Sequence, residues 1–87
     1  MTTPNELADR IDALGKYGDN ALDVLVEIAL FIPNKVYSGI RANSAGTKVI
    51  YTDPAMNEVT CWAQDWTTAK SRAGTIKALR AKGTDHG

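Results

Sequence analysis

The stretch from Ala21 to Ile32 most constrains what this chain can fold into, because it has a helical pattern and is apolar on most of its circumference. Asp23 and Glu27 alone interrupt it, and their i, i+4 spacing places both on one stripe, which we expect to face solvent. A helix with so narrow a polar stripe is buried on two or more sides. In 87 residues this calls for other helices on one side and a sheet, or a second subunit, on another.

Three helices are predicted, and the apolar stretch is the second of them, from Ala21 to about Phe31. The first runs from Pro4 to Leu14, with Thr3 as its cap and Gly15 as its stop. The last starts at Asp65, Thr67 or Thr68, runs to about Ala81 and stops at Gly83. Its expected apolar face consists of Ala69, Ala73, Ile76 and Leu79.

Between the second and last helices the chain is rich in β-branched and aromatic residues. Strands are predicted around 36–40, 47–52 and 59–63, separated by turn-forming residues at 43–46 and 53–57. The order α-α-β-β-β-α predicts the α+β class: two N-terminal helices, a three-stranded antiparallel meander, and a C-terminal helix packed on the sheet. We expect a single domain over residues 1–83 and a flexible tail over 84–87.

Composition excludes several classes of protein. Lys and Arg together number 10, as do Asp and Glu, so the chain lacks the basic excess typical of nucleic-acid binders. No apolar run is long enough to span a bilayer, and the first residues do not have the layout of a signal peptide. The sequence therefore predicts a cytoplasmic protein that does not bind membranes, and it disfavours a nucleic acid as the partner.

Reactive side chains are scarce. The chain has one Cys (Cys61) and one His (His86), and no Gly-rich phosphate loop. Cys61 follows a strand pattern beside Trp62, which is typical of a small buried hydrophobe, and His86 lies beyond the expected end of the last helix. No carboxylates follow a metal-ligand spacing. We expect no catalysis, no cofactor and no metal.

Binding chemistry is better represented. Tyr51 and Trp66 have ring faces on which a base can stack, although Tyr and Trp are also ordinary core residues. Arg72 and Arg80 border the Ala73/Ile76 stripe of the last helix, and with Arg41 they are the candidate contacts for a phosphate or another anion. Solvated basic residues near a helix C-terminus are the plainer interpretation.

A resemblance to known proteins rests on four segments. They are Glu6–Leu14 (ELADRIDAL), Leu22-Asp23 with its apolar helix, Val49–Pro54 (VIYTDP) followed by Trp62, and the ending Lys77–Ala81 (KALRA). Together they resemble a diffuse group of small phage and prophage proteins, many of which have a longer middle segment. The resemblance implies an α-β-α sandwich, a phage setting in the cytoplasm of a bacterial host, and no catalytic residues.

Small non-enzymatic phage proteins are often counter-defence factors, which orders the functional hypotheses. The first is a non-catalytic protein that sequesters a small anionic ligand, such as a nucleotide second messenger, as a homo-oligomer joined through helix 21–32. The alternative is a protein–protein inhibitor of a host defence complex, similar to an anti-CRISPR protein. A structural phage component without a ligand is third, and DNA binding is fourth.

Overall fold

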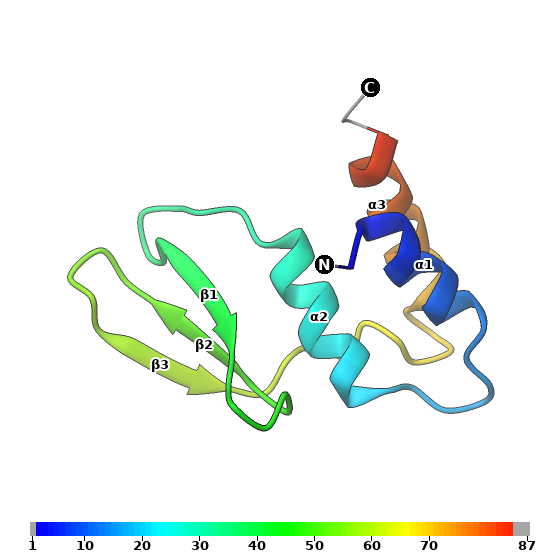
Figure 1. Cartoon of the computed structure of the whole chain (residues 1–87), viewed down its shortest axis with the longest axis horizontal. Helices are drawn as coiled ribbons and strands as arrows, with labels where there is room; N and C mark the ends of the chain where they lie inside the picture. Colours follow the sequence, from blue (N-terminus) through cyan, green and yellow to red (C-terminus); the bar gives the residue numbers. More distant parts are fainter. Residues whose placement is uncertain (1, 85–87) are drawn as a thin grey trace.

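The structure, a computed structural model, describes residues 2–84. Within this range three helices and three strands follow one another in the predicted order, which confirms the mixed α+β class (Figure 1). The elements are α1 (Pro4–Asp12), α2 (Asn20–Leu30), β1 (Gly39–Ala42), β2 (Val49–Thr52), β3 (Glu58–Cys61) and α3 (Arg72–Thr84). The predicted tail and His86 fall outside the described residues, except that α3 continues through Thr84.

Local capping chemistry sets the starts of the first two helices. The Thr3 hydroxyl accepts the Glu6 backbone N–H at 3.1 Å, and Pro4 occupies the first turn of α1. Asp19 accepts the Leu22 N–H at 3.0 Å and so begins α2. None of the described helices is both long and apolar enough to cross a membrane.

The sheet is an antiparallel meander in the order β1-β2-β3. Ile40, Tyr51 and Val59 are aligned across the three strands, and their row faces α2. In the described part of the chain α2 packs against β1 and β2 but not against β3 (Figure 1). Part of the sheet face beneath β3 is therefore left uncovered.

The main core lies on the opposite side of α2 from the sheet, where α1 and α3 pack against it (Figure 1). It consists of Leu7, Ala8, Ile11, Leu22, Val26 and Leu79. On the sheet side, Val24 of α2 and Val49 of β2 are also fully buried. The interpretation that α2 is buried on two sides is therefore correct, with helices on one side and the sheet on the other.

The last helix differs from its prediction in position and in phase. It packs on α1 and α2 and not on the sheet, because the connector of residues 62–71 leads the chain past α2 to its far side. Leu79 and Thr75 face the core, whereas Ala69 and Ala73 are exposed, so the predicted apolar face was only half right.

Two glycines allow close approaches that side chains would obstruct. Gly83 lies inside α3 and does not stop it; a Cβ there would be 2.6 Å from Asn5 Nδ2 of α1. Gly18 lies against the connector, where a Cβ would be 3.1 Å from Thr67 Oγ1 and 3.2 Å from the Thr68 nitrogen. Both positions serve packing between segments that are distant in sequence.

The stripe of Asp23 and Glu27 was predicted to face solvent, and this was wrong: both side chains are 6% exposed. Asp23 Oδ1 accepts the backbone N–H groups of Trp66 at 3.0 Å and Thr67 at 2.8 Å, and the Thr67 hydroxyl at 2.8 Å. That hydroxyl also accepts the Asp19 N–H. The connector is thus hydrogen-bonded to the first turn of α2, which explains why α3 does not start at Thr67 or Thr68.

Replacing Asp23 with Ala removes the single carboxylate oxygen that accepts hydrogen bonds from three donors, in a region that excludes water. We expect the free energy of unfolding to fall by about 2–4 kcal/mol, because buried donors left without partners are costly. Urea denaturation followed by far-ultraviolet circular dichroism measures the change. Asp12→Ala removes an exposed carboxylate of α1 and should change stability by less than about 0.5 kcal/mol. Equal losses in the two variants would contradict the role given to Asp23.

Candidate functional site

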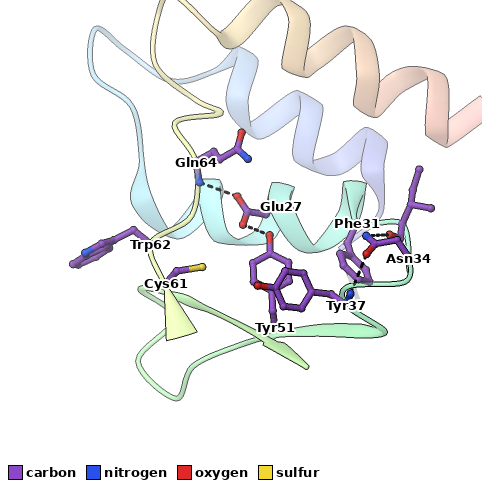
Figure 2. A pocket seen from close by; sticks show the side chains of 9 residues that line it. Glu27, Phe31, Asn34, Tyr37, Tyr51, Cys61, Trp62 and Gln64 are labelled. Atoms are coloured by element: carbon purple, nitrogen blue, oxygen red, sulfur yellow. Dashed lines mark hydrogen bonds between the residues drawn. The ribbon is translucent and has the colours of Figure 1, made fainter. Parts of the chain in front are cut away.

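Glu27, one helical turn after Asp23 along α2, holds the first half of the connector, at Gln64 and Trp66. Its Oε1 accepts the Gln64 backbone N–H at 2.8 Å and the Trp66 indole N–H at 3.1 Å, and its Oε2 accepts the Tyr51 hydroxyl proton (Figure 2). One buried carboxylate therefore joins α2, β2 and the connector. All three donors are neutral groups, so they solvate the charge without cancelling it.

An open pocket of about 480 Å³ lies beside this carboxylate, between α2 and the part of the sheet face that α2 leaves uncovered (Figure 2). Aromatic rings form much of its wall. The ring centroids of Tyr37 and Tyr51 are 4.7 Å apart, and those of Phe31 and Tyr51 are 6.0 Å apart. The lining residues are Glu27, Phe31, Ile32, Asn34, Tyr37, Tyr51, Cys61, Trp62 and Gln64. We call this space the aromatic pocket.

Asn34 shapes the mouth of the pocket at the end of α2. Its side-chain oxygen accepts the backbone N–H groups of Val36 at 2.8 Å and Tyr37 at 2.9 Å, and its amide donates to the Ile32 carbonyl. These bonds turn the chain after Pro33 and place Tyr37 against Tyr51. The aromatic wall therefore depends on a local turn as well as on the sheet.

The electrostatics of the pocket are set by burial and by the charge of Glu27. Burial raises the pKa of the Tyr51 hydroxyl well above its ordinary value, and the hydrogen bond to Glu27 raises this pKa further. The pKa of the Cys61 thiol is also raised, first by burial and then by the negative charge of Glu27. Cys61 is therefore held as a thiol, the weakly nucleophilic form.

Tyr51 and Trp66, the two rings predicted to bind a ligand, are brought together at Glu27. Tyr51 lines the aromatic pocket and donates its hydroxyl to this carboxylate. Trp66 donates its indole N–H to the same group but packs against the helical core, so that it supports the pocket from behind. One of the two rings therefore faces the space that a ligand can enter.

The three predicted anion contacts are dispersed and engaged within the chain. Arg41 lies on the other face of the sheet, where it pairs with Glu58. Arg80 of α3 pairs with Asp9 of α1 at 2.9 Å. Arg72 donates to the carbonyl oxygens of Thr67 and Leu14 and so fastens the connector to the end of α1. None of the three lines the aromatic pocket.

Sequence reasoning missed Glu27 as the centre of the site. A usable signal existed: α2 contains no Lys or Arg, so two acids spaced at i, i+4 repel each other on an exposed surface. Such a pair in an apolar helix indicates partners supplied by another segment. The chain between the second and last helices was noted as rich in aromatic residues, but nothing in the spacing of Tyr37 and Trp62 showed that they share a pocket with Phe31. Over residues 2–84 no three His, Cys, Asp or Glu side chains gather as a possible metal site.

The pH dependence of Cys61 alkylation reports how strongly Glu27 raises the pKa of the thiol. We expect the rate with iodoacetamide to rise with pH around a midpoint above that of a free thiol, because the folded chain disfavours the thiolate. Glu27→Gln keeps one oxygen for the two N–H donors and removes the charge, so the midpoint should move to lower pH while the effect of burial stays. Glu6→Gln, on the exposed surface of α1, is the matched control. An unmoved midpoint in Glu27→Gln would show that the charge does not reach Cys61.

No family model, curated protein or solved structure matches this chain. The function is therefore inferred from the geometry of the aromatic pocket and from the chemistry of the residues around it.

Proposed function

We propose that this chain is a non-catalytic binding protein that sequesters a small molecule in the aromatic pocket. The observation that carries the proposal is the pocket itself: a space of about 480 Å³ with ring faces on one wall and a buried carboxylate at its base. Pockets that combine apolar rings with a few placed polar groups are the usual form of small-molecule sites. A volume of this size is that of a small organic ligand.

The side chains around the pocket support binding in preference to turnover. Cys61 is the one lining residue with a nucleophilic thiol, and its raised pKa works against thiolate formation. Glu27 already accepts three hydrogen bonds, which hold it in place and leave it poorly suited to shuttle a proton. A rigid acceptor beside rings recognises a ligand without changing it.

The resemblance to small phage proteins suggests a setting for this activity. Within it, the protein acts in the cytoplasm of a bacterial host as a counter-defence factor that lowers the free concentration of a signalling molecule. A nucleotide second messenger remains a candidate because its base can stack on Tyr37 or on Trp62. Its phosphates would have to reach Lys48, whose Nζ lies 4.6 Å from the Trp62 ring centroid, since the three arginines are engaged elsewhere.

Thermal unfolding in the presence of nucleosides, nucleotides, cyclic dinucleotides and small amines tests the proposed function. A ligand at a hundredfold its Kd adds about 2.7 kcal/mol to stability, which gives a clear rise in Tm. Trp62→Ala and Tyr37→Ala should abolish the rise, because they remove ring faces from the pocket. Tyr17→Ala removes an exposed ring on the α1–α2 connection and should keep it. A rise that survives both pocket variants would place the ligand elsewhere.

A second candidate function, inhibition of a host protein, is favoured by the surface around β3. Within the described chain this strand pairs on one side only, and Met56, Val59 and Trp62 on and beside it are exposed. A free strand edge with apolar neighbours can add a strand from another protein. Capture of one host protein that is lost in Val59→Lys, with no ligand detected in the pocket, would favour this function over sequestration.

Self-association through α2 remains part of the proposal. Leu25, Ile28 and Ala29 are only half-buried in the single chain and border an apolar hollow of about 360 Å³ with Leu7 and Thr2. We expect multi-angle light scattering at micromolar concentration to give at least a dimer, and Ile28→Glu to give a monomer, because a buried charge opposes association. A monomeric wild-type chain would contradict self-association and leave the pocket proposal standing.

A further inference from the structure

The charge of the aromatic pocket indicates which ligands it accepts. Glu27 is 6% exposed and is the one charged side chain among the lining residues. Across residues 2–84 neither of the ion pairs, Arg41–Glu58 and Arg80–Asp9, includes it. Its hydrogen-bond donors within the chain are all neutral, so no positive side chain offsets the carboxylate inside the pocket. The pocket is therefore negative.

The ring faces of the pocket also favour a cation over an anion. The face of an aromatic ring carries partial negative charge and attracts cations. Phe31, Tyr37 and Tyr51 form a tilted cluster next to Glu27 (Figure 2). At the rim, Trp62 already holds one cation of the chain, because Lys48 Nζ lies 4.6 Å from its ring centroid.

Glu27 also has acceptor capacity left for a ligand. Its Oε1 accepts two hydrogen bonds, but its Oε2 accepts one, from Tyr51. Each carboxylate oxygen can accept about two. An ammonium group in the pocket can therefore approach Oε2 without displacing any donor of the chain.

Resting on the proposed function, we infer that the ligand of the aromatic pocket is a small organic cation, held by an ammonium group between the ring faces and the Glu27 carboxylate. An anion at the same place meets a carboxylate and electron-rich rings, with no basic side chain among the described lining residues. The pKa of the Cys61 thiol is raised first by burial and second by Glu27, which disfavours another negative charge nearby. The inference reverses the ligand charge that the sequence alone suggested.

The test compares choline with 3,3-dimethylbutan-1-ol, which has the same shape with carbon in place of the charged nitrogen. Binding to the full chain is followed by nuclear magnetic resonance at constant ionic strength. The Gln64 backbone N–H and the Trp66 indole N–H both donate to Glu27, so their signals report on the carboxylate directly. We expect choline to bind about tenfold more tightly than the neutral alcohol, in line with cation–π and charge attraction at a desolvated site.

Two variants locate the source of the preference. Glu27→Gln should remove most of it, and Glu6→Gln, the same change on the exposed surface of α1, should keep it. Lys48→Met removes a like charge beside Trp62 and should tighten choline binding. If Glu27→Gln does not fold, the comparison of choline with the alcohol on the wild-type chain and the effect of Lys48→Met on choline binding test the cationic ligand.

The outcomes separate the inference from the proposed function. Equal binding of choline and the alcohol overturns the cationic ligand and leaves small-molecule binding in place. Binding of adenosine monophosphate in the pocket, without binding of choline, also overturns the cationic ligand. It leaves small-molecule binding in place and favours a nucleotide. Binding of none of the probes, and of no compound in the thermal panel, overturns both proposals.

Discussion

Two carboxylates on one face of α2 determine how the rest of this chain is arranged. Asp23 and Glu27 lie one turn apart, are nearly inaccessible to water, and accept hydrogen bonds from the connector that follows the sheet. Burying two negative charges without a paired cation is costly unless every acceptor is satisfied. The connector supplies neutral donors in a fixed order, and no buried side-chain polar atom in the described residues lacks a partner.

This arrangement explains the route of the chain. Because Trp66 and Thr67 are bound to Asp23, the connector passes α2 as irregular chain, turns over residues 68–71, and α3 begins only at Arg72. Arg72 then ties the connector back to the Leu14 carbonyl, so the α1–α3 pair is held to the same end of α2. The helical core and the sheet thus share α2 as a common wall, and the two carboxylates align them.

The aromatic pocket is a consequence of the same geometry. One helix covers two of three strands, and the third leaves a hollow whose base is the helix face that carries Glu27. A carboxylate needed to hold the connector is therefore also the charged group of the pocket. We propose that this one side chain has both a structural and a recognition role, which is why Glu27→Gln, close in shape, is more informative than a truncation.

Local sequence patterns were sufficient for the class and order of the elements. The signals are local: Thr3 and Asp19 cap the first two helices, the apolar stretch follows Asp19, and the sequence period changes after Pro33. The structure has an element at each of these places. The phase of α3 was not set locally, because Thr67 is bound to Asp23 of α2 and Arg72 to the carbonyl of Leu14, which follows α1.

The sequence by itself determined that α2 must be buried on two sides and that reactive side chains are scarce. Only the tertiary structure decided that Asp23 and Glu27 face inward, that Arg41, Arg72 and Arg80 are engaged within the chain, and that the pocket is lined by an acidic side chain and no basic one. The physical reason is that a charged side chain takes its role from partners distant in sequence. Periodicity records which face of a helix is polar, but it does not record whether water or another segment solvates that face.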